Sequence, residues 1–111
     1  MQKRNIYGER SRITKQIKKE LKDKKALVQC AENFNVIGDF TRLKVCYLLC
    51  HHKGLSVGEI ADVVGISISA VSHTLKKLQE AKIAESYRVH RNVYYQLKKS
   101  PFTNIIKSQF K

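Results

Sequence analysis

A one-residue junction between two capped helical segments constrains the fold of this chain more than any other feature. Ser56 and Glu59 have the spacing of a capping box, in which each side chain bonds the other residue's backbone amide. Gly65 is then typical of a helix end, and after Ile66 alone Ser67 is typical of the next helix start. Two short helices joined by so short a glycine turn predict a helix-turn-helix over about residues 56–81.

The second helix of this pair has an apolar side and a polar side. Val71, Leu75 and Leu78 recur at helical spacing and are expected to face the core. The outward side carries small polar residues first and cations later, which suits a helix end that enters the major groove of DNA while lysines reach flanking phosphates. Its members are Ser69, Ala70, Ser72, His73, Lys76 and Lys77.

Two strand-like runs follow, "IAESYRV" and the alternating "NVYYQL". The tip between them lacks glycine, and only Asn92 readily tolerates a left-handed turn there. The tip presents His90 and Arg91. A basic hairpin directly after a helix-turn-helix predicts a wing over about residues 83–98, suited to phosphate or minor-groove contact.

The two ends of the chain each carry an amphipathic helical pattern. Apolar residues from Ile13 to Phe34 recur at helical spacing behind Ser11, a possible cap, and Ser100 with Pro101 begins a C-terminal helix over about 101–110. Mutual burial of these stripes across a two-fold axis would form a homodimer, and packing within one subunit is the alternative. After the first helical pattern, Gly38 is typical of a helix end and Asp39 of the next helix start, which predicts a largely buried central helix directly after them.

These patterns predict one small domain, mainly α-helical with a small β-hairpin. We expect a winged helix-turn-helix with helical dimerisation elements at both ends. A basic flexible tail is predicted over residues 1–10, and the single domain over residues 11–111.

The charge predicts a polyanionic partner. Twenty-two lysines and arginines oppose nine acidic residues in 111, giving a net charge of +13, and ten of those cations lie in residues 1–25 against three acids. Double-stranded DNA is the expected partner. Since no apolar run approaches the roughly 20 residues of a membrane span, we expect no membrane partner and a cytoplasmic protein. No nucleophile–base pair or glycine-rich phosphate loop is evident, so neither an enzyme nor a bound cofactor is predicted.

The three cysteines have several interpretations. Cys46 and Cys50 are four residues apart and share one helical face, with two histidines directly after them. Together with Cys30 they could sense redox state, or they could bind a soft metal ion such as Zn²⁺. Free cysteine also packs well as a small hydrophobe, so simple core filling is the third interpretation.

Three segments resemble the ArsR/SmtB family of winged helix-turn-helix repressors. They are "GDFTRLKVCYLL", "LSVGEIADVVGISISAVSHTLKKLQEAKI" and "SYRVHRNVYYQL", and the resemblance covers roughly residues 36–98. It implies a dimeric repressor that binds a palindromic operator and is released by an inducer. It further implies base reading by Ser69, Ser72 and His73, phosphate contact by Ser67, and wing contacts by Arg91 and His90.

The sequence departs from that family at its metal sites. Ser56 and Gly58 occupy positions where metal sensors of the family place cysteines, and "KKSPFTNIIKSQFK" lacks the acidic and histidine pairs of their C-terminal zinc site. Phe40 replaces the usual proline, and the usual wing glycine is missing. No metal site is therefore predicted, although a thiol- or metal-responsive repressor stays open through the cysteines. The alternatives are a constitutive DNA binder without an inducer, of viral or mobile-element type, and a protein-interaction module.

Overall fold

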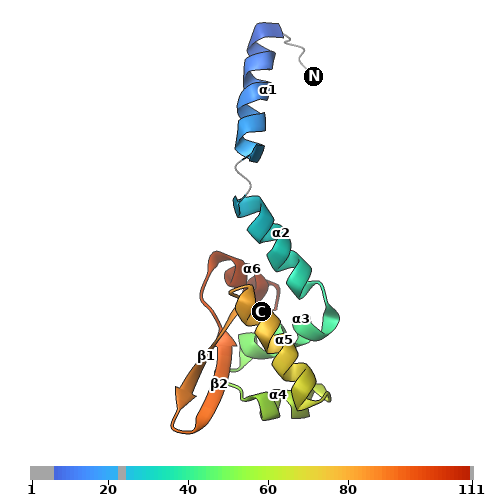
Figure 1. The fold of residues 1–111 in the computed structure, drawn as a ribbon, viewed down its shortest axis with the longest axis vertical. Coiled ribbons are helices and arrows are strands. Elements are labelled where there is room, and N and C mark those ends of the chain that lie inside the picture. The colour runs from blue at the N-terminus through green and yellow to red at the C-terminus, as the bar shows by residue number, and fades with distance from the viewer. Residues whose placement is uncertain (1–6, 23–24, 111) are drawn as a thin grey trace. The chain divides into compact units, whose positions relative to one another are not determined.

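The computed structural model describes residues 7–22 and 25–110. Its contacts divide the chain into two units, residues 1–31 and residues 32–111. In chain order the elements are α1 (Tyr7–Lys22), α2 (Lys25–Ile37), α3 (Phe40–His51), α4 (Val57–Val64), α5 (Ile68–Glu80), β1 (Ala84–Val89), β2 (Asn92–Leu97) and α6 (Pro101–Gln109) (Figure 1). The boundary between the units falls within α2.

The first unit contains α1 and the beginning of α2. Helix α1 begins at Tyr7, so Ser11 lies inside the helix and does not cap it, contrary to our prediction. The helical pattern predicted to run through to Phe34 is described as two helices, with residues 23–24 outside the described part. The part of the predicted tail before Tyr7 is also outside the described residues. Residues 7–10, expected in that tail, are helical.

The helices of the second unit begin where their capping residues predict. Asp39 accepts a hydrogen bond from the Arg42 amide at 3.0 Å and starts α3. The predicted capping box is present at α4: Ser56 Oγ accepts from the Glu59 amide at 3.1 Å, and Glu59 accepts from the Ser56 amide at 2.9 Å. Gly65 ends α4 at a φ of 81°, in the left-handed region. The turn into α5 is therefore the predicted one.

The hairpin pairs β1 with β2 in the antiparallel register Ala84↔Leu97 to Val89↔Asn92. A two-residue tip closes it, and His90, not Asn92 as expected, takes the positive φ of 56°. An isolated bridge ties the hairpin to the loop before α4: Leu55 and Tyr95 exchange backbone hydrogen bonds of 3.2 and 2.8 Å. This bridge fixes the wing to the helix-turn-helix.

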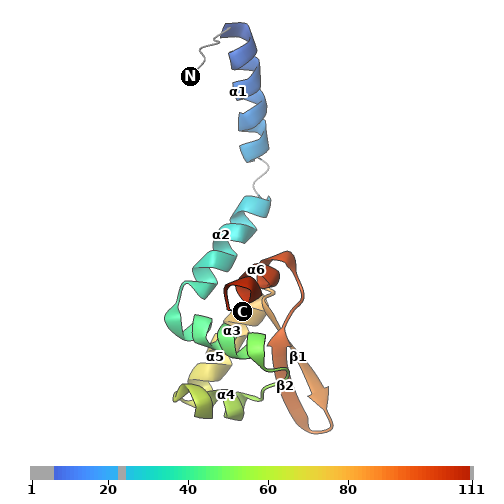
Figure 2. The same ribbon diagram turned by 180° about the vertical axis from the view of Figure 1, so that it is seen from behind.

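The core of the second unit lies among α3, α4, α5, the base of the hairpin and α6. Figures 1 and 2 show α6 at one end of this unit and α4 with the hairpin tip at the other. In α6 the predicted apolar stripe is only partly buried, because Thr103 takes an interior position and Ile105 faces outward. The largest fully buried side chains are Val45, Cys46, Ile60, Val71, Leu75, Leu78, Ile83 and Thr103. None of the described helices is long and apolar enough to cross a membrane.

Candidate nucleic-acid interface

Helix α5 is held firmly along one side. Ser67 caps it, with Oγ accepting from the Ala70 amide at 3.0 Å. Val71, Leu75 and Leu78 are at most 1% exposed and anchor the helix in the core. A rigid anchor of this kind fixes which residues face outward, and it orients the N-terminal turn toward solvent.

The outward face of α5 carries the polar residues that the sequence predicts. Ser69, Ser72, His73 and Lys76 are all exposed. Ser69, His73 and Lys76 follow the helical spacing i, i+4 and i+7, so they form one line along the helix. Short side chains stand at the N-terminal end of that line and the cation at the other. This arrangement places hydrogen-bonding groups, with little bulk, where a helix would approach base edges.

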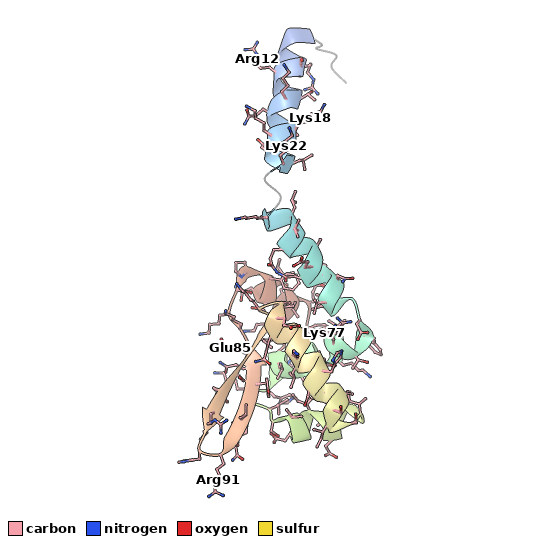
Figure 3. All side chains as sticks on the ribbon, in the orientation of Figure 1. Arg12, Lys18, Lys22, Lys77, Glu85 and Arg91 are labelled. Atoms are coloured by element: carbon pink, nitrogen blue, oxygen red, sulfur yellow. The ribbon has the colours of Figure 1, made fainter. Side chains whose placement is uncertain are left out.

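Lys77 lies apart from this line. It is half-buried and borders a separate hollow of about 280 Å³ with Arg42 of α3, Glu32 and Asn35 of α2, and Glu80. Of the six residues predicted to contact DNA at α5, Ser67 is therefore at the capping position and Lys77 is on the flank (Figure 3). The other four are on the outward face: Ser69, Ser72, His73 and Lys76.

The wing presents the two predicted cations at its tip. His90 and Arg91 are exposed, and Arg91 extends beyond the end of the hairpin (Figure 3). The tilted ring pair of Tyr87 and Tyr94, with centroids 5.8 Å apart, stiffens the strands below it. Gly54, in the loop before α4, lies so close to the Tyr87 hydroxyl that a Cβ at this position would overlap it. This loop therefore also supports this part of the wing.

Three further residues were not predicted to belong to this surface. Ile68, in the first turn of α5, is 61% exposed, and an apolar side chain there suits contact with a thymine methyl. Arg88 is exposed on β1. Glu80 is exposed near the end of the α5 line, where a carboxylate would repel phosphate. Helical phase is the signal that could have identified Ile68 from the sequence, because it lies four residues before Ser72 and so on the same side of α5.

The three cysteines lie in different surroundings. Cys46 is fully buried, and burial raises the pKa of its thiol to about 12. Cys50 is partly buried, and burial raises its pKa while the nearby Lys107 ammonium acts in the opposite direction. Cys30 is exposed in the first unit. Across residues 7–22 and 25–110, no three histidine, cysteine or acidic side chains gather as metal ligands, and Cys46 serves as core filling.

Comparison with known proteins places this arrangement in a family. Residues 37–87 match the model of the helix-turn-helix domain, a range that covers α3, α4, α5 and the first part of β1. The chain is 33% identical over 91 residues to the transcriptional repressor SmtB homolog of Synechocystis, a match that covers 82% of this chain and 68% of that protein. The chain belongs to the ArsR/SmtB family. The resemblance inferred from the sequence is confirmed.

Other ArsR/SmtB relatives extend the comparison. The cadmium resistance transcriptional regulatory protein CadC of Listeria innocua is 30% identical over 73 residues, and the match covers 66% of this chain. It spans 61% of the length of that relative. A homodimeric winged helix-turn-helix DNA-binding domain from Mycobacterium bovis, a possible ArsR-family regulator, has a TM-score of 0.70 at 24% identity, covering 78% of this chain and 82% of that one. The predicted winged helix fold is thereby confirmed for this ArsR/SmtB member.

Proposed function

We propose that this protein is a sequence-specific transcriptional repressor that acts as a homodimer on a palindromic operator. The observation that carries the proposal is the face of α5 on which Ser69, Ser72 and His73 are exposed while the opposite face is locked in the core. We assign base reading to these three residues and to Ile68. Ser67 and Lys76 contact flanking phosphates, and His90 and Arg91 contact the backbone beside the groove.

Lys77 has a smaller part in this proposal. Its place in the hollow with Glu32 and Glu80 allows the ammonium to reach a phosphate only at the edge of the interface. We therefore assign it a long-range electrostatic contribution, together with the cations of α1 such as Arg12, Lys18 and Lys22 (Figure 3). Since each neutralised phosphate releases about one counterion, affinity falls steeply with added salt.

Unpaired apolar surface supports the homodimer. Ile13, Ile17 and Leu21 form a stripe along α1 and are between 37% and 57% exposed. In the second unit, Phe34 of α2 stacks edge-on against Phe102 of α6 at 5.2 Å, yet Phe34 and Ile105 remain about half exposed. Burial of such stripes by a second copy removes apolar area from water, and the Mycobacterium bovis domain is itself homodimeric.

The relatives named above are transcriptional regulators, so we assign the chain no enzymatic activity. We place the protein in the cytoplasm, where operator DNA lies. We propose no resident metal or other cofactor.

The test replaces two proposed base-reading side chains. In the double variant Ser72→Ala/His73→Ala, the preference for a selected operator over random DNA should fall roughly 10- to 100-fold, because a good base contact is worth about 1–3 kcal/mol. The control, Ser108→Ala/His52→Ala, removes the same two groups from exposed positions outside α5. Operator selection from a random library, gel-shift titration and sedimentation measure the preference and the dimer. An unchanged preference with an intact dimer would remove α5 from the reading role.

A further inference from the structure

A second concave site lies at the base of the hairpin, away from the wing tip. It is a cavity of about 600 Å³ between the C-terminal end of α3, the hairpin base and α6. Its apolar lining comes from Leu49 and Leu97, both buried, and the Cys50 thiol lies beside them. A cavity of this volume is in the range of sites for small organic molecules.

The rim of this cavity is strongly cationic. Four lysines border it, Lys53, Lys98, Lys99 and Lys107, against the single carboxylate of Glu85. That carboxylate already accepts a hydrogen bond from the Gln96 side-chain amide at 2.9 Å. In the described part of the chain, no carboxylate lies within ion-pair distance of the four ammonium groups. The rim therefore attracts anions, while the apolar lining favours a ligand with a carbon body.

The position of the cavity separates it from the proposed DNA contacts. Glu85 pairs with Gln96 at the hairpin base, and Val89 pairs with Asn92 at the tip, four residues farther along. At about 3.4 Å per residue, this places the tip roughly 14 Å from the cavity. Figure 3 shows Glu85 at the base and Arg91 at the tip of the same hairpin. The part of the cavity at the hairpin base thus lies at the opposite end of the hairpin from His90 and Arg91.

We propose that this cavity binds a small organic anion, one that carries a carboxylate, sulfonate or phosphate group on an apolar body, and that its occupancy changes DNA affinity. The four lysines hold the anionic group, and Leu49, Leu97 and Cys50 contact the carbon body. The second half of the proposal rests on the proposed DNA-binding function. A ligand that contacts α3, α6 and the hairpin base together alters how the wing is held, which gives occupancy a route to the DNA contacts.

Cys50 provides a direct probe of the cavity. In a Cys30→Ser background, Cys50 is the accessible thiol, since Cys46 is fully buried with a pKa of about 12. The dianionic aromatic disulfide 5,5′-dithiobis(2-nitrobenzoate) has the chemistry proposed for the ligand. The Cys50 thiol loses its proton to solvent and its sulfur attacks the reagent disulfide, which breaks, leaving a mixed disulfide on Cys50 and releasing one thionitrobenzoate. The neutral 4,4′-dithiodipyridine reacts by the same exchange and serves as the uncharged reference.

The ratio of the two rate constants tests anion binding without any DNA. Lys107→Gln should lower the ratio of the anionic to the neutral rate roughly 5-fold, because a nearby partly screened charge is removed. Lys25→Gln, an exposed lysine on α2, should leave the ratio unchanged. Naphthalene-1-sulfonate should slow both reactions to a saturable extent, and less so in Lys107→Gln. An unchanged ratio in Lys107→Gln, or no protection by the sulfonate, would overturn the site.

The regulatory half is tested with the labelled protein. Cys50 carrying the nitrobenzoate group is compared in operator gel shifts with Cys50 carrying only a methylthio group. A change in operator affinity of about 3-fold or more between the two supports coupling, and equal affinities overturn it. If neither form prefers operator to random DNA, the proposed function fails while the rate measurements still decide the cavity.

Discussion

Substituting Gly54 by alanine tests how the wing is fixed to the helix-turn-helix. Gly54 has a φ of +74°, which an alanine adopts at a cost of roughly 1–2 kcal/mol. A Cβ at this position would also overlap the Tyr87 hydroxyl on β1. Displacing that ring disturbs its packing on Tyr94, and the overpacking should cost about 1–2 kcal/mol, the lower part of the usual range, because the exposed Tyr87 ring can shift outward. We expect a total loss of about 2–4 kcal/mol of unfolding free energy.

A double-mutant cycle separates the two contributions. In a Tyr87→Phe background the hydroxyl is gone, and the nearest remaining ring atom, Cζ, is 3.3 Å from the added Cβ. Gly54→Ala should then cost only the backbone part, so the coupling between the two positions should be about 1–2 kcal/mol. Thermal unfolding followed by circular dichroism measures it, since 1 kcal/mol moves Tm by about 4–8 °C in a domain of this size.

Gly58→Ala is the matched control. It lies in the first turn of α4, and a Cβ built there meets nothing within 4 Å. Alanine should therefore stabilise the helix, by about 0.5–1 kcal/mol. If Gly54→Ala costs the same with tyrosine and with phenylalanine at position 87, the contact does not fix the wing and the reasoning is refuted.

Two further variants test the caps. Ser67→Ala removes the acceptor of the 3.0 Å hydrogen bond from the Ala70 amide, so it should cost about 1 kcal/mol and lower Tm by several degrees. Ser67→Asp should keep the stability yet weaken DNA binding in gel shifts. Equal stability of the alanine variant and the wild type would contradict the cap. At Glu59, hydrogen bonds from Ser56 lower the carboxyl pKa in the folded state, so its stabilising contribution is present above its ordinary pKa and is lost as pH falls through the folded value. Glu59→Gln should flatten the pH dependence of unfolding in that acid range, and an unchanged acid profile would contradict this.

The second unit could be predicted closely because its boundaries depend on local chemistry. Asp39, Ser56, Ser67 and Ser100 each cap a helix at the predicted residue, since the side-chain oxygen satisfies amides only a few residues away. The inward residues of α5 followed equally from helical periodicity. The family resemblance then supplied a hypothesis that local chemistry does not, namely that Ser69, Ser72 and His73 read bases, and this assignment stays a prediction.

The remaining differences depend on surroundings that a sequence pattern does not contain. Ile105 has the spacing of a core residue but is 52% exposed, because Thr103 occupies the interior instead. There its hydroxyl donates to the Lys98 carbonyl at 2.7 Å, joining α6 to the end of β2. At the hairpin tip, the pairing of Val89 with Asn92 leaves a two-residue loop of His90 and Arg91. The left-handed conformation that the sequence predicts at Asn92 is therefore adopted by His90. Lys77 is half-buried because it borders the hollow that α5 shares with Arg42 of α3 and Asn35 of α2.

Regulation of such a protein requires a contact that differs between its DNA-binding and released states. Burial of Cys46 makes that thiol a poor switch, since its pKa of about 12 leaves little thiolate to oxidise or to bind metal. The lysine-rimmed cavity is better placed, because its wall includes Gln96 and Leu97, next to the Tyr95 bridge that holds the wing. A ligand there acts on the base of the hairpin whose tip carries His90 and Arg91. The short hairpin then joins the cavity to the wing tip. Coupling between the two sites therefore does not need a pathway through the helical core.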